Sequence, residues 1–189
     1  MTPQTSPPLG AAELSVLAGV GDEAKTLLSA DDLPRDFIEQ LLAKGLFPDA
    51  VRVIAHALPR REAVWWAWVC ARKVAGAEPA PPVQAALDAT ERWIVQPTDE
   101  NRREALLFGE AAEFGTPAGC AALAVFMSSG SLAPPELPPV PPGEFLTAKA
   151  VSGSVTLAAV AEPDHTEEKF QEFLKLGLEV ADRTKMWVA

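Results

Sequence analysis

The chain has few of the residues from which metal and catalytic sites are built. It contains two cysteines, two histidines and no tyrosine among 189 residues. His56 lies in an apolar stretch and His165 in an acidic one, while Cys70 and Cys120 are dispersed, so no zinc-ligand spacing exists. We expect His56 to be a core or helix-cap residue, and both cysteines to be buried free thiols in a reducing compartment.

The motifs of common nucleotide-binding and hydrolytic sites are also missing. The glycines at 19–21 lack the Walker lysine spacing, and the serines at 128–131 do not form G-x-S-x-G. The acidic group of Asp164, Glu167 and Glu168 is typical of a solvated helix start rather than of a metal site. The sequence therefore predicts no catalytic residue, no cofactor and no metal, and it favours a protein that is not an enzyme.

An excess of basic residues and a long apolar run are absent as well. The formal net charge is −10, with −5 in residues 1–100 and −5 in residues 101–189. Such a charge disfavours nonspecific binding to nucleic acid or to anionic lipid. The apolar run at 63–71 is too short to cross a membrane, and residues 1–8 do not resemble a secretory signal. We expect a cytoplasmic protein without nucleic-acid or membrane partners.

Proline and glycine, by contrast, are present in numbers that divide the chain into short helices. Eighteen prolines and twelve glycines separate segments with helical periodicity. We predict an all-α fold, a compact bundle of seven or eight short helices with proline-rich connections. A short solenoid of helical hairpins is the alternative, placed second because no motif repeats at a fixed period. Residues 1–10 are expected to be a disordered tail and 11–189 a single helical domain.

The segment 147–160 fits two descriptions. Ala148, Val151, Val155 and Ala158 lie on one face of a helix that Thr147 would cap. The order of Val151, a glycine and Val155 also alternates as a strand would. The alanines and the cap favour the helix.

A proline-rich strap at 130–143 follows the Ser/Gly stretch. It contains Pro135-Glu136-Leu137-Pro138 and Pro138-Pro139-Val140-Pro141, which both fit the P-x-x-P spacing of polyproline II recognition. We expect mainly an extended strap in which Leu132, Leu137 and Val140 pack onto helices. A docking peptide for another protein and a free linker are the alternatives.

Three of the five tryptophans lie within four positions, in a helix that Pro59 opens. On that helix Arg61 lies beside Trp65, and Trp68 lies beside Arg72, which predicts a ladder of cation–π contacts. The nearly all-apolar surface favours a core helix whose arginine stems reach solvent. The alternatives are nucleotide stacking and a binding patch for a protein partner. That patch would comprise Arg60, Arg61, Trp65, Trp66 and Arg72.

Five segments together resemble an uncharacterised bacterial family. They are LPRREAVWW at 58–66, ERWI at 91–94 followed by Pro97, SGSLAP at 129–134, VPP at 140–142 and TAKAV at 147–151. The resemblance covers about residues 32–185. The family is loosely associated with type VI secretion gene clusters, which implies a cytoplasmic accessory protein, an adaptor or co-chaperone for an effector or a spike-tip protein. It carries no assigned chemistry, so it implies no catalytic residue.

Three functions are consistent with these features. The favoured one is a non-enzymatic protein-interaction module that binds a secretion-system effector or component. The alternatives are an immunity-type inhibitor of a toxin, for which the acidic surface would suit a basic target, and a helical protein that binds a small ligand. In the last case tryptophans would line the pocket and His56 or Glu62 would be its polar group.

Overall fold

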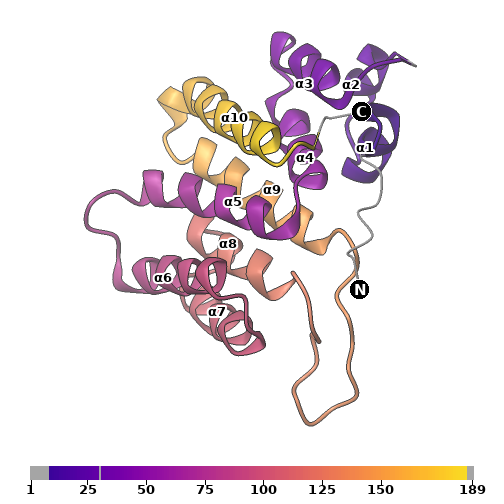
Figure 1. Ribbon diagram of the computed structural model, residues 1–189. Helices are drawn as coiled ribbons and strands as arrows, with labels where there is room; N and C mark the ends of the chain where they lie inside the picture. Colours follow the sequence, from indigo (N-terminus) through magenta and orange to yellow (C-terminus); the bar gives the residue numbers. More distant parts are fainter. Residues whose placement is uncertain (1–8, 30, 187–189) are drawn as a thin grey trace.

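The computed structural model describes residues 9–29 and 31–186, which form an all-helical fold without strands (Figure 1). The all-α prediction is confirmed, and the ten α-helices found among these residues are close to the seven or eight expected. Residues 1–8 of the expected disordered tail lie outside the described residues. The helices are α1 (Ala11–Ala18), α2 (Asp22–Leu27), α3 (Pro34–Ala43), α4 (Phe47–Ala57), α5 (Arg60–Ala75), α6 (Pro81–Val95), α7 (Asp99–Ala111), α8 (Pro117–Phe126), α9 (Leu146–Ala159) and α10 (Thr166–Arg183), with a 3-10 turn, η1, at Pro163–His165.

The helix ends follow the local sequence signals. The hydroxyl of Thr98 accepts a hydrogen bond from the Asn101 amide at 3.2 Å, which caps α7. Gly45 ends the α3 region with φ of +71°, in the left-handed conformation that glycine adopts without a steric penalty. Gly19 is also left-handed, at φ of +60°, and it separates α1 from α2.

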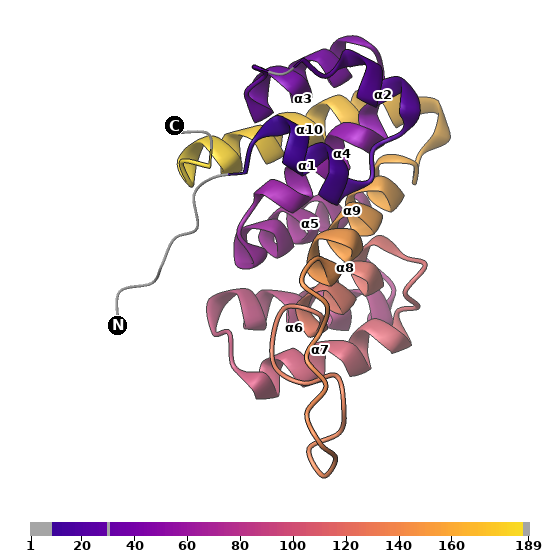
Figure 2. The same cartoon turned by 90° about the vertical axis from the view of Figure 1, so that its right-hand side faces the viewer.

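The helices pack as a bundle around α5 and α9. Helix α9 contacts α4, α5, α8 and α10, and α5 contacts α6, α8 and α10. Figures 1 and 2 show α1–α4 and α10 on one side of this central pair and α6–α8 on the other. Elements distant in sequence therefore share one continuous cluster of buried apolar side chains. In a solenoid each hairpin contacts only its neighbours, so this pattern favours the bundle.

The ambiguous segment 147–160 is helical, as α9. Its valines and alanines, including Val151 and Val155, are buried between α5 and α8. Gly153 permits close packing, because a Cβ there would lie 3.0 Å from the Cys120 sulfur. Thr147 is not the cap that the sequence indicated: its hydroxyl donates to the Met127 carbonyl at 2.9 Å and so ties α9 to the end of α8.

Candidate functional site: a proline loop and a tryptophan groove

The three tryptophans of α5 have different surroundings. Trp66 is fully buried, and its indole Nε1 donates to the Phe173 carbonyl of α10 at 2.8 Å. Trp68 is half-buried, and its Nε1 donates to the Leu87 carbonyl of α6 at 3.0 Å. Both indoles thus join α5 to a neighbouring helix, as expected of a core helix. Because Trp66 is not exposed at the surface, the expectation that it forms part of a partner-binding patch is wrong.

The expected ladder of arginines and tryptophans does not form. Arg61 donates instead to the carbonyls of Ile94 at 2.6 Å and Val95 at 3.4 Å, at the end of α6. The last carbonyls of a helix lack partners within the helix, so they attract the guanidinium. Arg72 donates to the Gln84 amide oxygen at 2.9 Å. The cation that stacks on Trp65 is Arg183 of α10, 5.5 Å from the ring centroid.

These contacts leave an open groove, which we call the Trp65 groove, between the ends of α5, α6 and α10. Its volume is about 490 Å³. The half-buried Trp65 lines it together with two exposed arginines, so an apolar floor lies beside positive charge. The lining residues are Arg61, Glu62, Trp65, Ile94, Val180, Arg183 and Thr184.

Arg60 does not line the groove but contacts the residues that flank the proline-rich segment. Its guanidinium donates to the Ser128 carbonyl at 2.6 Å and to the Glu144 carbonyl at 3.3 Å. These two residues flank the proline-rich segment, so Arg60 joins the two ends of that segment. Of the five residues expected to form one patch, only Arg61 and Trp65 line the same groove.

The proline-rich segment, which we call the proline loop (130–143), projects from the bundle instead of lying against it (Figures 1 and 2). Leu137 is 58% exposed and Val140 52% exposed, while Leu132 is half-buried. The expectation that Leu137 and Val140 pack onto helices is therefore wrong. The loop leaves the bundle at its base, and no helix of the described residues covers the proline-rich backbone beyond that point.

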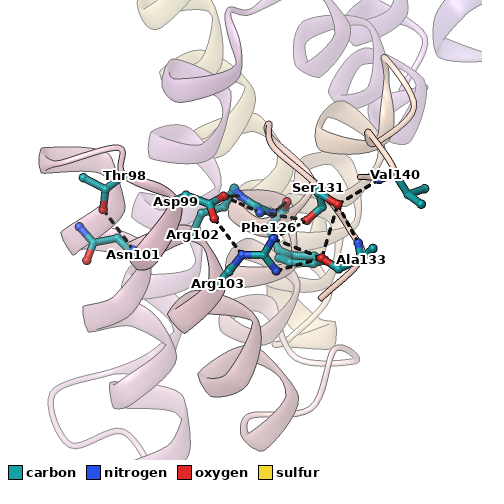
Figure 3. A network of polar contacts seen from close by, with 9 residues as sticks. All are labelled: Thr98, Asp99, Asn101, Arg102, Arg103, Phe126, Ser131, Ala133 and Val140. Carbon is teal, nitrogen blue, oxygen red and sulfur yellow. Dashed lines mark hydrogen bonds and ion pairs between the residues drawn. The ribbon is translucent and has the colours of Figure 1, made fainter. Parts of the chain in front are cut away.

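Arg102 anchors that base from inside the protein, as Figure 3 shows. Its side chain is fully buried on α7, and it donates to the Phe126 carbonyl at 2.8 Å and to the Ser131 carbonyl at 3.0 Å. Its Nε and Nη2 also donate to one carboxylate oxygen of Asp99, at 2.8 and 2.7 Å, and Nη2 is the nitrogen that donates to Ser131 as well. A buried guanidinium is costly unless it is hydrogen-bonded, and here each of its three nitrogens donates at least one of the four bonds.

Arg103 and Ser131 close the neck of the loop. Arg103 donates to the Ala133 carbonyl at 3.2 Å, and the Ser131 hydroxyl accepts from the Val140 amide at 3.0 Å. The Leu132 amide also donates to the Val140 carbonyl at 2.8 Å. Arg103 and then Arg102 hold the pKa of Asp99 below its usual range. Arg102 and Arg103 were not singled out from the sequence, because nothing in their spacing along the helix shows that their partners lie in the loop.

The two P-x-x-P stretches differ in conformation. The Leu137 amide donates to the Pro134 carbonyl at 3.1 Å, so the first stretch forms a turn at the loop tip. The stretch 138–142 has no such turn. Proline fixes φ near −65° and restricts the residue before it to extended conformations, so this stretch is biased towards polyproline II.

His56 lies at a second, smaller cavity of about 170 Å³, lined also by Arg60 and Phe145. It is buried, its Nδ1 lies 2.8 Å from the Arg52 carbonyl, and its Nε2 has no partner among the described residues. Burial lowers the pKa of His56, and the positive charges of Lys149 and Arg52 add to that effect. No tryptophan lines this cavity, whereas Glu62 and Trp65 line the same groove, so of the two alternative polar groups only Glu62 lies in a pocket with a tryptophan.

The lowered pKa of His56 predicts a loss of stability in mild acid. The unfolded chain binds a proton near pH 6.5 and the folded protein only at lower pH, so the free energy of unfolding falls as pH drops below 6.5. The slope contributed by this group is at most about 1.4 kcal/mol per pH unit. Urea unfolding at pH 7.5 and pH 5.5 measures the fall, which should shrink in His56→Gln and persist in His165→Gln. An equal fall in both variants would contradict the assignment.

The remaining sequence expectations concern cysteine, metals and membranes. Cys70 and Cys120 are unpaired and buried, as predicted. Burial raises the pKa of both thiols, that of Cys120 to about 11, so neither is an activated nucleophile. Within residues 9–29 and 31–186, no three His, Cys, Asp or Glu side chains cluster so that they could hold a metal ion. Over the same residues no helix has the length and apolar character to span a membrane.

Comparison with known proteins identifies the family. Searches of curated proteins and of solved structures found no match. A family model described as a family of unknown function (DUF6931) matches residues 37–181, a stretch from α3 to α10 that includes the proline loop and Arg102. This match covers more than half of the chain, and the protein therefore belongs to the DUF6931 family of unknown function.

Proposed function

We propose that the protein is a non-enzymatic protein-interaction module that presents the proline loop to a partner protein. The observation that supports this is the contrast within the loop. Its apolar residues Leu137 and Val140 are more than half exposed, while its base is held by the fully buried Arg102. A loop held ready in one conformation loses less entropy on binding than a flexible chain does.

The chemistry of the loop indicates the kind of partner. The extended stretch 138–142 carries four prolines and the exposed Val140, and its only side-chain functions are apolar. Aromatic-lined grooves bind such segments, because the polyproline II conformation is already formed and costs little entropy. We therefore propose a partner whose binding surface is a groove lined by aromatic rings.

We place this role in the bacterial cytoplasm, as an adaptor or co-chaperone for a type VI secretion effector or spike-tip component. The support is the sequence resemblance of the segments 58–66, 91–94 and 129–134, together with the unpaired cysteines, which fit a reducing compartment.

Site-specific photocrosslinking in the native host tests the proposal. A photoreactive phenylalanine analogue replaces Leu137 or Val140 at the loop, or Val160, which is 44% exposed after α9, as the control. We expect the same protein adduct from both loop positions and none from Val160. An adduct with an effector or spike protein supports the adaptor role, whereas an adduct with a toxin would favour the immunity alternative. Absence of adducts at the loop, or equal adducts at all three positions, would sink the proposal.

A further inference from the structure

We propose that the proline loop of one copy docks into the Trp65 groove of a second copy, in a reciprocal exchange about a two-fold axis. This inference rests on the proposed role of the loop as a recognition element. It adds the surface that receives the loop, and hence a self-associated state of the protein.

The Trp65 groove has the chemistry to receive a proline-rich segment. Trp65 offers an aromatic wall, and Ile94 and Val180 extend the apolar floor. Proline-rich segments dock against such aromatic walls. The volume of about 490 Å³ is large enough for the few side chains of a loop tip.

Charge distinguishes the loop tip as the occupant. Glu136 is the only charged residue in 130–143; it is exposed and forms no ion pair with a described residue. Arg61 and Arg183 both line the groove, against the single acid Glu62, in a protein whose net charge is −10. A carboxylate between two guanidinium groups is the complementary arrangement.

The apolar part of the tip matches as well. Leu137 follows Glu136 directly and is 58% exposed, so the tip carries a carboxylate beside an unpartnered aliphatic side chain. The groove offers a partner for each of the two side chains, because the Arg183 guanidinium, a cation, lies over the apolar Trp65 ring at 5.5 Å from its centroid. Docking would bury Leu137 against the indole and place Glu136 beside the guanidinium.

Two adjacent residues place the base of the loop close to the groove. Arg60 holds both ends of the loop through the Ser128 and Glu144 carbonyls, and Arg61 lines the groove. A two-fold axis beside this point directs each loop towards the groove of the other copy, and the same contact then forms twice. Closed two-fold dimers of this kind are the commonest form of self-association.

The expected association is weak, because each contact involves only a loop tip and an open groove. Interfaces burying less than about 1,200 Å² belong to transient complexes. The exposed ion pair is screened by salt, so the dimer should dissociate as ionic strength rises.

Charge reversal tests the inference by sedimentation of the full-length chain. For the wild type, the mass should rise from 20.1 kDa towards twice that value between about 5 and about 500 µM. Glu136→Arg and Arg183→Glu should each remain monomeric. An equimolar mixture of the two should dimerise again. In that mixed dimer the altered loop of one variant meets the altered groove of the other with the two charges exchanged, and the unaltered loop meets the unaltered groove.

Arg72→Glu is the matched control, since it makes the same charge change at the other, exposed end of α5 and should keep wild-type association. A wild type that stays at 20.1 kDa throughout, or a mixture that does not dimerise, overturns the inference. In that event a crosslinked adduct between Leu137 and a different protein would leave the proposed function standing. If no adduct forms at the loop, both the proposed function and this inference are overturned.

Discussion

Replacing Trp66 with alanine should lower the free energy of unfolding by about 3–5 kcal/mol. The indole is fully buried where α10 crosses α5, and a Cβ on Gly177 would lie only 2.9 Å from its ring atoms. Truncation therefore opens a cavity between two helices that already approach as closely as glycine allows. It also leaves the Phe173 carbonyl without the indole donor that lies 2.8 Å away. Urea unfolding followed by far-ultraviolet circular dichroism measures the loss.

Trp65→Ala is the control for this prediction. Trp65 is half-buried, and apart from the stacked Arg183 it faces the open groove, so its removal should cost only about 1–2 kcal/mol. Trp66→Phe retains most of the ring volume and should fall between the two. Equal losses for the two alanine variants would contradict the division of α5 into a core side and a groove side.

Replacing Arg102 with methionine should lower the free energy of unfolding by about 2–4 kcal/mol, because two buried or partly buried carbonyls lose charged donors at once. The larger consequence should be local. Without Arg102 the Phe126 and Ser131 carbonyls lose their common partner, so the neck of the proline loop should open. The Leu132 and Val140 amides, which are bonded across the neck, should then exchange hydrogen at least about ten times faster.

Arg103→Met serves as the matched control. Arg103 is only partly buried and contacts the outer side of the same neck, through the Ala133 carbonyl and Asp99. Its loss should cost about 1 kcal/mol and change the exchange of both amides less. If Arg102→Met leaves the Leu132 and Val140 amides as protected as in the wild type, the guanidinium does not hold the loop.

The neck of the loop favours glycine at position 130 over a residue with a side chain. It adopts φ of +67°, and a Cβ there would lie 2.8 Å from an Asp99 carboxylate oxygen and 2.9 Å from the Arg102 guanidinium. The glycine thus permits both the left-handed turn and the close approach of the ion pair to the backbone. In the sequence it is the single glycine of the stretch 128–131, and the two residues that it approaches, Asp99 and Arg102, lie about thirty residues earlier.

Hydrophobic periodicity and proline spacing were enough to predict the helices, because both act through contacts of three or four residues along the chain. Thr98 caps α7 through the nearby Asn101 amide, and Gly45 ends the α3 region, so both helix ends depend on residues close along the chain. The same local reasoning failed for Thr147, which bonds to Met127 across the loop instead of capping its own helix. The prediction failed because a hydroxyl also bonds to a group distant in sequence when the fold brings that group within hydrogen-bond distance.

The sequence alone thus determined the all-α class, the positions of most helices and the burial of both cysteines, all properties that depend on composition and local pattern. Only the tertiary structure decided which arginine meets which partner. Arg61 was expected beside Trp65, yet it binds the end of α6, and Arg183, more than a hundred residues away, stacks on that indole. It also decided that the proline loop projects, from a neck bound by Arg102, a buried charge whose partners Phe126, Asp99 and Ser131 are brought together only by the fold.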